Sequence, residues 1–304
     1  ASGKKYGAII IKNDYEERLF PGIHPAKGSV DDMTFDELVE IVRNAGVVGM
    51  GGATFPTYAK LKSAYGKIRY LIVNCAECEP YITVNHRLML ESPEKIVNGL
   101  LLLMKCFGLN KGYIAVEDNK IDGAVSLESA IDDPDLIDIC LMKTKYPQGG
   151  EKQLCQAITG KQVPPGKLPA DIGCAVFNIN TTMAIYRAIT QGMPVVKKVV
   201  TVSGSGVVEP KNLECPIGTP VSLLFDACGG LKDETFKLIA GGPMMGMAQA
   251  SADFPVAKGT GAVLAFAGDE NKTVENPTCI RCGRCVEACP VHLEPLYLYM
   301  YQQK

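Results

Sequence analysis

The sequence has almost no net charge, no long apolar run and few histidines, and each shortage excludes a class of protein. The 304 residues carry a formal net charge of −2, so no overall basic field points to a nucleic-acid partner. The longest apolar run lies near residues 100–104, far short of the roughly 20 residues that cross a bilayer. His24, His86 and His292 are scattered, which offers no histidine-based metal or nucleophile site.

Cysteine is the residue type whose number calls for an explanation. Twelve cysteines in a chain of this length lie below the density of a disulfide scaffold. The first residues show no apolar signal segment, which favours a reducing compartment. The cysteines are therefore expected to be metal ligands, reactive thiols or small buried side chains.

Strand-like and helix-like segments alternate through the first part of the chain, which predicts an α/β domain built on a parallel sheet. A capping box at residues 34–37 begins one helix, and Ser92-Pro93 begins another that ends at Gly108. Further strands are expected at residues 6–12, 68–73, 113–116, 136–142, 195–202 and 236–240. Further helices are expected at residues 123–131, 151–159, 181–191 and 218–230.

The periodicity changes after about residue 193, where a shorter α+β region begins. A polar linker then precedes the last cysteines. We therefore expect an N-terminal strand and linker over 1–33, an α/β domain over 34–193, an α+β domain over 194–267 and a cysteine-rich segment over 268–304.

The strongest motif is the run CIRCGRCVEACP at residues 279–290, with Cys279, Cys282, Cys285 and Cys289. This spacing is that of bacterial ferredoxins, in which the first three thiolates surround one 4Fe-4S cube and the fourth binds a second cube. Zinc favours two separated pairs of cysteines, so an iron–sulfur site is the better interpretation. No cysteine follows Cys289, so we expect this chain to complete neither cube in the usual way.

A glycine-rich segment, GVVGMGGATFPT at residues 46–57, lies between two helical stretches. Its backbone N–H groups can approach a phosphate or a flat ring, and Lys60 one turn later can neutralise a phosphate. The segment does not follow a strand, so it is not the usual dinucleotide fingerprint. A tight connection without a ligand explains it equally well.

Polar side chains follow a predicted strand directly, at Asn74, Glu77 and Glu79. Ligands bind at the carboxyl ends of parallel strands, so this cluster is a candidate site. Cys75 and Cys78 lie within it and allow a redox or zinc interpretation, but no second metal pair is near them in the sequence, and packing is the better one.

Two further segments also lie at the boundaries of predicted strands or helices. YPQGGEK at residues 146–152 follows a predicted strand and opens a helix, whose N-terminus can bind an anion. Asn178 precedes another helix. Each alone can be a helix cap, but together they support one site in the α/β domain.

These segments together resemble the RnfC family, the NADH-facing subunit of the membrane ferredoxin:NAD oxidoreductase complex. They resemble more distantly the flavin-carrying NADH subunit of respiratory complex I. The matching strings follow one another through nearly the whole chain: GVVGMGGATFPTYAKL (46–61), LIVNCAECEPYITVNHRLML (71–90), EDNK (117–120), KYPQGGEKQL (145–154), TGKQVP (159–164), AGGPMMG (240–246) and the ferredoxin run.

The resemblance implies an FMN site and an NADH site in the α/β domain. For the flavin it implies contacts from Gly49, Gly51, Gly52, Lys60, Asn74, Glu77, Gly149, Gly150, Glu151 and Asn178. Lys60 and Asn178 fall near the phosphate. On the NADH side, Phe55 is expected to stack and Glu79 to meet the ribose or amide.

The fold implied by the resemblance is a Rossmann-like parallel-sheet flavin/NADH domain, a β-grasp domain for soluble ligands, and the start of a helical ferredoxin-like domain. The cofactors implied are FMN, NAD(H) and 4Fe-4S clusters, two in the complete protein. NAD(H) exchanges electrons in pairs and iron–sulfur cubes exchange them singly, so a flavin is needed between them. The implied partners are other Rnf-type membrane subunits and a ferredoxin-like iron–sulfur subunit, at the cytoplasmic face of the cell membrane.

The chain departs from this pattern at several places. Ala76 stands where the complex I relatives carry an acidic residue, and Gly150 stands where they carry glutamate. Both changes reduce the polar surroundings of the flavin and favour an alternative, a non-catalytic docking subunit. An RnfC-like relay to a soluble reductase is a third possibility. Residues 6–12 are expected to be the last strand of a lipoyl-like module that is otherwise absent.

Overall fold

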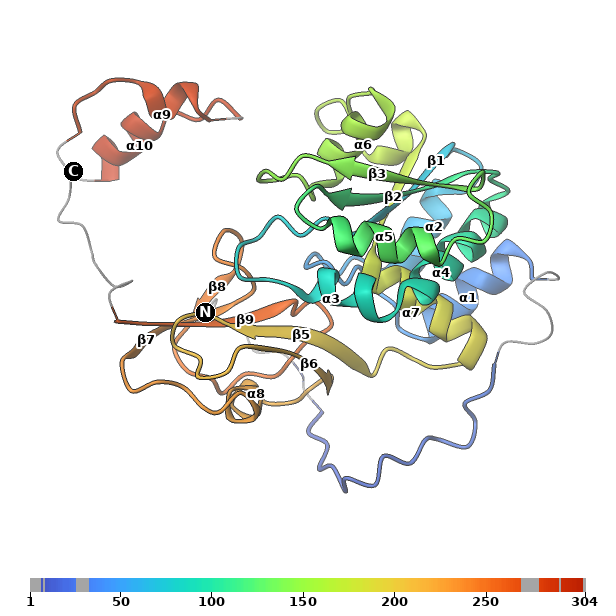
Figure 1. Cartoon of the computed structure of the whole chain (residues 1–304), viewed down its shortest axis with the longest axis horizontal. Helices are drawn as coiled ribbons and strands as arrows, with labels where there is room; N and C mark the ends of the chain where they lie inside the picture. The colour runs from blue at the N-terminus through green and yellow to red at the C-terminus, as the bar shows by residue number, and fades with distance from the viewer. Residues whose placement is uncertain (1–6, 8, 26–32, 269–278, 290, 303–304) are drawn as a thin grey trace. The chain divides into compact units, whose positions relative to one another are not determined.

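The computed structural model describes residues 7, 9–25, 33–268, 279–289 and 291–302. The chain divides into two units, residues 1–268 and residues 269–304, and each unit is described by itself. Figure 1 shows the elements along the chain. Among the described residues, no helix combines the length and the apolar character needed to cross a membrane.

The first sheet of the larger unit is wholly parallel, with the strand order β3-β2-β1-β4. Its strands are β1 (Tyr70–Asn74), β2 (Gly112–Glu117), β3 (Ile137–Met142) and β4 (Cys174–Asn178). Parallel strands end at the same edge, so the residues that follow β1 and β4 are brought together there. The predicted parallel α/β domain is confirmed.

Helices cover both faces of this sheet (Figure 1). They are α1 (Phe35–Asn44), α2 (Thr57–Ala64), α3 (Val84–Glu91), α4 (Pro93–Phe107), α5 (Ile121–Ser129), α6 (Glu151–Thr159), η2 (Pro169–Ile172) and α7 (Ile179–Gln191). The larger core lies between one face and helices α1 to α5 and α7, with Leu71 and Ile114 fully buried from the sheet side. On the other face, Ile72 packs with Leu154 of α6.

Local signals mark the helix ends as the sequence predicts, although the Ser92 side chain before α4 makes no capping hydrogen bond. In α1 both bonds of the capping box form: the Glu37 N–H donates to Thr34 Oγ1 over 3.3 Å, and the Thr34 N–H donates to Glu37 Oε2 over 2.9 Å. α4 begins at Pro93 and ends before Gly108, whose φ of 66° is left-handed.

The strand expected at residues 6–12 is not seen at residues 7 and 9–12, the part of that segment that the structure describes. The described residues of that segment pair with no neighbouring strand, and Ile10 is 96% exposed. A strand needs a partner to satisfy its backbone hydrogen bonds, and the described part of the chain provides none here.

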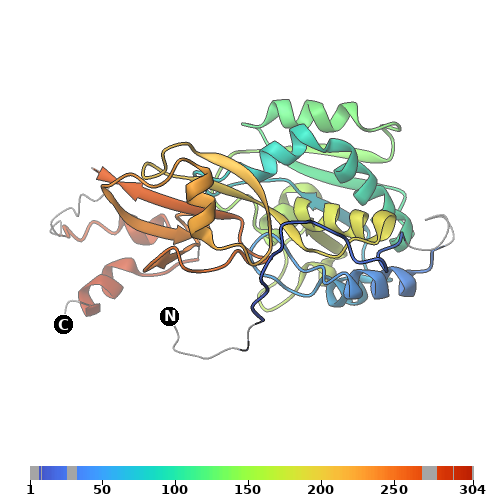
Figure 2. The same ribbon diagram turned by 90° about the horizontal axis from the view of Figure 1, so that it is seen from below.

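The larger unit continues into a second, five-stranded sheet with the order β6-β5-β9-β7-β8. Figure 2 draws this region in yellow and orange. Its elements are β5 (Lys197–Ser203), β6 (Lys211–Pro216), α8 (Val221–Ala227), β7 (Thr235–Ala240), β8 (Met247–Gln249) and β9 (Ala262–Ala267). β5 pairs with β9 in parallel, and the other pairs are antiparallel. Val200, Phe225 and Val263 pack in a core of their own. The predicted α+β region is confirmed.

The smaller unit contains two short helices among its described residues. They are α9 (Arg284–Glu287) and α10 (Pro295–Gln302). α9 holds Cys285, and the Leu293 N–H donates to Cys289 Sγ over 3.3 Å just after it.

Candidate cofactor site

A cavity of about 1040 Å³ opens at the carboxyl edge of the parallel sheet. This volume is at the upper end of the roughly 300–1,000 Å³ that small-molecule sites occupy. Every cofactor residue expected from the sequence lines it except Gly150: Gly49, Gly51, Gly52, Phe55, Lys60, Asn74, Glu77, Glu79, Gly149, Glu151 and Asn178. Segments far apart in the sequence therefore meet around one space.

The glycine segment folds back on itself to form one wall. The Gly49 N–H donates to the Phe55 carbonyl over 2.8 Å, and the Thr54 N–H donates to the Gly49 carbonyl over 3.0 Å. A Cβ on Gly51 would lie 3.1 Å from Asn178 Nδ2, so the loop approaches the start of α7 as closely as glycine permits.

Asn74, the last residue of β1, connects two loops of the site. Its Nδ2 donates to the Gly149 carbonyl over 2.8 Å, and its Oδ1 accepts the Ala76 N–H over 3.0 Å. Gly150 occupies the N-cap position of α6, and a Cβ there would meet Gln153 instead of the cavity. This explains why Gly149 and Glu151 line the cavity and Gly150 does not.

Glu77 is held by the start of α3, where the Asn85 N–H donates to its Oε1 over 2.8 Å. Burial raises the pKa of Glu77 to about 7, against the lowering effect of the Asn85 and His86 N–H groups. Beneath it, Glu117 of β2 accepts the Glu77 N–H over 2.9 Å, and burial also raises the pKa of Glu117.

Glu117 was not predicted as a site residue, although it begins the string EDNK. Its side chain is fully buried, and Oε1 has no hydrogen-bond partner among the described residues. A carboxylate at the last position of a buried strand is the signal that points to it, because a buried charge needs a structural or functional reason.

The raised pKa of Glu77 predicts a pH-dependent stability. The protonated form is favoured in the folded chain, so this contribution is full below the ordinary pKa of about 4.5 and is lost as the pH rises through about 7. We expect Glu77→Gln to remove about 3 kcal/mol of the fall in unfolding free energy over this range. Urea unfolding measured across the range tests this, with exposed Glu128→Gln as the control. An unchanged pH slope in Glu77→Gln would contradict it.

Glu79 also lines the cavity, and the region of the second sheet, residues 194–267 (the second module), reaches it there. Its carboxylate accepts the N–H groups of Met244 and Met245, each over 2.9 Å. Phe55 stands at the cavity with 57% of its surface exposed. The residues expected on the NADH side are thus accessible or held by a loop of the second sheet.

Lys60 forms an ion pair with Glu151, the first residue of α6. The ammonium also lies 5.3 Å from the centre of the Phe177 ring. The charge of Lys60 is therefore already balanced by a carboxylate within the site.

Two lysines of the second module also reach the glycine segment, and neither was predicted. Lys198 Nζ donates to the Met50 carbonyl over 2.9 Å, and Lys258 Nζ donates to the Gly46 carbonyl. Nothing in their local sequence marks them, because the strand and loop that carry them are brought to the glycine segment only by the tertiary fold.

The features of this cavity fit a flavin mononucleotide. The glycine wall lets a ring or phosphate approach the backbone, and amide, carboxylate and ammonium groups surround the space. The cysteine run has the donor set of a 4Fe-4S site, with Cys279, Cys282 and Cys285 exposed and Cys289 half-buried. Within the described residues, the four thiols do not gather into a metal-binding cluster.

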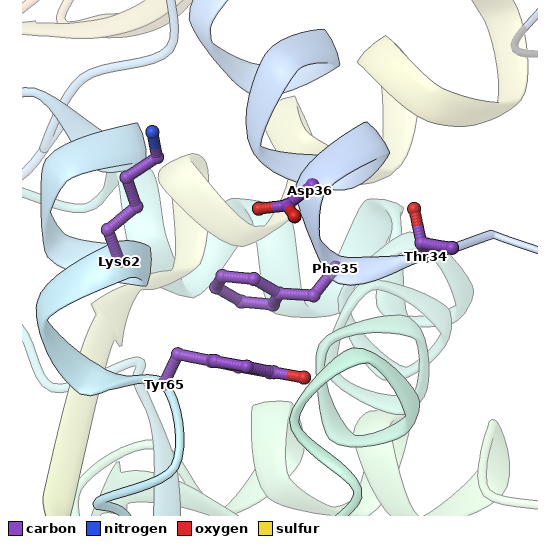
Figure 3. A pocket seen from close by; sticks show the side chains of 5 residues that line it. All are labelled: Thr34, Phe35, Asp36, Lys62 and Tyr65. Atoms are coloured by element: carbon purple, nitrogen blue, oxygen red, sulfur yellow. The ribbon is translucent and has the colours of Figure 1, made fainter.

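A smaller pocket of about 430 Å³ lies elsewhere, next to the N-terminus of α1 (Figure 3). The rings of Phe35 and Tyr65 stack there with centroids 3.8 Å apart. None of the expected cofactor residues lines this pocket, so it is not the predicted site.

The fold and the cavity define a flavin-binding α/β domain joined to a β-grasp domain. Three family models agree with this class: the Nuo51 FMN-binding domain matches residues 42–187, the SLBB domain matches 199–248, and the 4Fe-4S binding domain matches 274–292.

Relatives that match along the whole chain identify the family. The chain is 43% identical to the C subunit of the Na(+)-translocating ferredoxin:NAD(+) oxidoreductase complex of Acetobacterium woodii, over 100% of this chain and 69% of that protein. It is 41% identical to the C subunit of the proton-translocating ferredoxin:NAD(+) oxidoreductase complex of Clostridium ljungdahlii, over 99% of this chain and 65% of that protein. It is 40% identical to the C subunit of the ion-translocating oxidoreductase complex of Rhodobacter capsulatus, over 98% and 57%.

The chain belongs to this RnfC family, the C subunits of ion-translocating oxidoreductase complexes, as the sequence motifs predict. It spans about 57–69% of the length of these relatives. A solved NAD+-reducing NiFe hydrogenase in the H2-reduced state shares the fold, with a TM-score of 0.65 at 22% identity over 80% of this chain and 49% of that chain. The same kind of hydrogenase in its air-oxidised state gives a TM-score of 0.64 at 23% identity, over 80% of this chain and 51% of that chain. The expected family and fold class are confirmed.

Proposed function

We propose that this chain passes electrons between iron–sulfur clusters, FMN and NAD(H) as part of a membrane-associated ferredoxin:NAD+ oxidoreductase. The observation that carries the proposal is the convergence of eleven of the twelve expected cofactor residues on one cavity. When bound, FMN supplies a group that exchanges electrons both singly and in pairs.

The residues of the chain act by binding and orienting. Gly49, Gly51 and Gly52 let the flavin approach the backbone, while Asn74 keeps the loops after β1 and before α6 together. On the other side, Glu79 is the candidate contact of the NADH ribose or amide. With FMN and NADH bound, hydride transfer between them would need no side chain as an acid or base, so the residues would contribute binding and orientation.

The assembly and location belong to the same proposal. The RnfC relatives are named as parts of ion-translocating complexes, which supports other Rnf-type membrane subunits and a ferredoxin-like iron–sulfur subunit as partners. We place the chain peripherally at the cytoplasmic face of the cell membrane. The four expected domains, 1–33, 34–193, 194–267 and 268–304, stand as proposed boundaries.

An anaerobic titration tests the flavin chemistry. The 304-residue chain loaded with FMN is expected to lose its visible flavin absorbance on addition of NADH. Flavin that binds but keeps its absorbance would contradict the hydride role. Bovine serum albumin mixed with FMN serves as the control for reduction of free flavin.

A docking subunit without chemistry remains the second candidate, because Ala76 and Gly150 remove polar groups that complex I relatives carry. Asn74→Ala in the assembled complex separates the two candidates. Loss of flavin together with NADH turnover supports the electron-transfer role, and unchanged turnover supports docking.

A further inference from the structure

Lys198 places a positive charge in the wall of the cavity from the second module. It is the second residue of β5, it lines the cavity, and only 3% of its surface is exposed. Its neighbour Lys197 points outward on the same strand and pairs with Glu17. The alternation along β5 therefore sends one lysine to solvent and the other to the site.

The ammonium of Lys198 is incompletely satisfied within the described residues. It has three N–H donors, and one of them donates to the Met50 carbonyl over 2.9 Å. No described carboxylate pairs with it, and the other ionisable group that acts on it is the Cys215 thiol. Burial lowers the pKa of Lys198 to about 8. A buried cation without a counter-charge is costly, so a bound anion would relieve it.

The surroundings of Lys198 suit an anion. Met50, which accepts its hydrogen bond, also donates its N–H to Thr181 Oγ1 over 2.9 Å. Thr181 lies in the first turn of the 13-residue helix α7, and Asn178 caps that helix beside Gly51. The positive end of a helix, the glycine loop and a buried ammonium thus adjoin one another in the lining of the cavity.

Lys60 is less suited to be the main counter-charge. It already pairs with Glu151, and 25% of its side chain is exposed. An anion binding to Lys60 would compete with a carboxylate, whereas an anion binding to Lys198 would meet an ammonium without one.

We propose that Lys198, a residue of the β-grasp module, binds the phosphoryl group of FMN at the start of α7. The inference rests on FMN as the ligand of this cavity. It makes the flavin site a joint product of both modules. The β-grasp module then takes part directly in holding the cofactor.

Binding of FMN and of riboflavin, which lacks the phosphoryl group, tests this directly. We expect Lys198→Met to weaken FMN binding about 10- to 100-fold, the loss typical of a hydrogen bond to a charged group, and to leave riboflavin binding unchanged. Isothermal titration or flavin fluorescence quenching with the 304-residue chain measures both affinities. Lys197→Met is the matched control, because it removes the same charge from the outer face of the same strand.

The outcomes separate the inference from the proposed function. If the unaltered chain does not bind FMN, both are overturned. If it binds FMN and Lys198→Met binds FMN equally well, the inference alone is overturned. Equal losses for FMN and riboflavin also overturn it, because they assign Lys198 to shaping the Met50 loop.

A second variant covers a loss of folding. Lys198→Gln keeps a donor for the Met50 carbonyl but removes the charge. It is expected to lose the preference for FMN over riboflavin, and retention of that preference would overturn the inference. Thermal unfolding of each variant without flavin shows whether the fold is retained.

Discussion

Gly242→Ala is expected to weaken NADH binding about 10-fold while leaving FMN binding unchanged. A Cβ on Gly242 would lie 2.8 Å from the Cβ of Glu79 and closer still to its carboxylate. The glutamate side chain can move more easily than the backbone, so it would leave the N–H groups of Met244 and Met245. Losing the orientation of one charged contact corresponds to about 1.4 kcal/mol, or 10-fold in affinity.

The measurement is the KM for NADH of the FMN-loaded chain together with a separate FMN titration. Gly261→Ala is the control, because Gly261 also lines the cavity from the second module and a Cβ there meets nothing within 4 Å. An unchanged KM for NADH, or an equal loss of FMN affinity, would show that Glu79 does not serve the NADH side.

The strong local signals in the sequence predicted their elements well. α1 carries a capping box at its start, and α4 is bounded by Ser92-Pro93 and Gly108. These signals act between neighbours in the chain, so they hold whatever the tertiary fold is. The strand expected at residues 6–12 is absent from the described residues 7 and 9–12 for the opposite reason, since a strand depends on a partner that local sequence does not show.

Two buried strands were missed because their residues do not alternate. β4 is buried at all but its last position, and β9 is buried throughout. Short, fully apolar runs of this kind cannot be distinguished from buried helix by periodicity. Asn178 was therefore placed from local sequence at the start of a helix, and its position at the end of the strand beside β1 was missed, although it was already counted among the site residues.

The cavity was predictable where the motifs are local and hidden where it depends on the second module. The loops around Gly51, Asn74 and Glu151 were identified from glycines and polar residues at strand and helix boundaries. Lys198 and the loop of Met244 reach the same space from beyond residue 193, and only folding brings them there. Local sequence patterns therefore reveal only the part of this site that the α/β domain contributes.

Gly204→Ala is expected to lower the unfolding free energy by about 3 kcal/mol or more. Gly204 has φ +105°, and a Cβ there would lie within about 3.1 Å of backbone atoms of Ala265 in β9. Gly218→Ala is the matched control, because φ is +98° and the space is open, so it is expected to cost only about 1 kcal/mol. The chain lacks tryptophan, so tyrosine fluorescence or circular dichroism follows the urea unfolding. Equal losses in the two variants would show that backbone conformation alone, without the close approach of β9, requires glycine at residue 204.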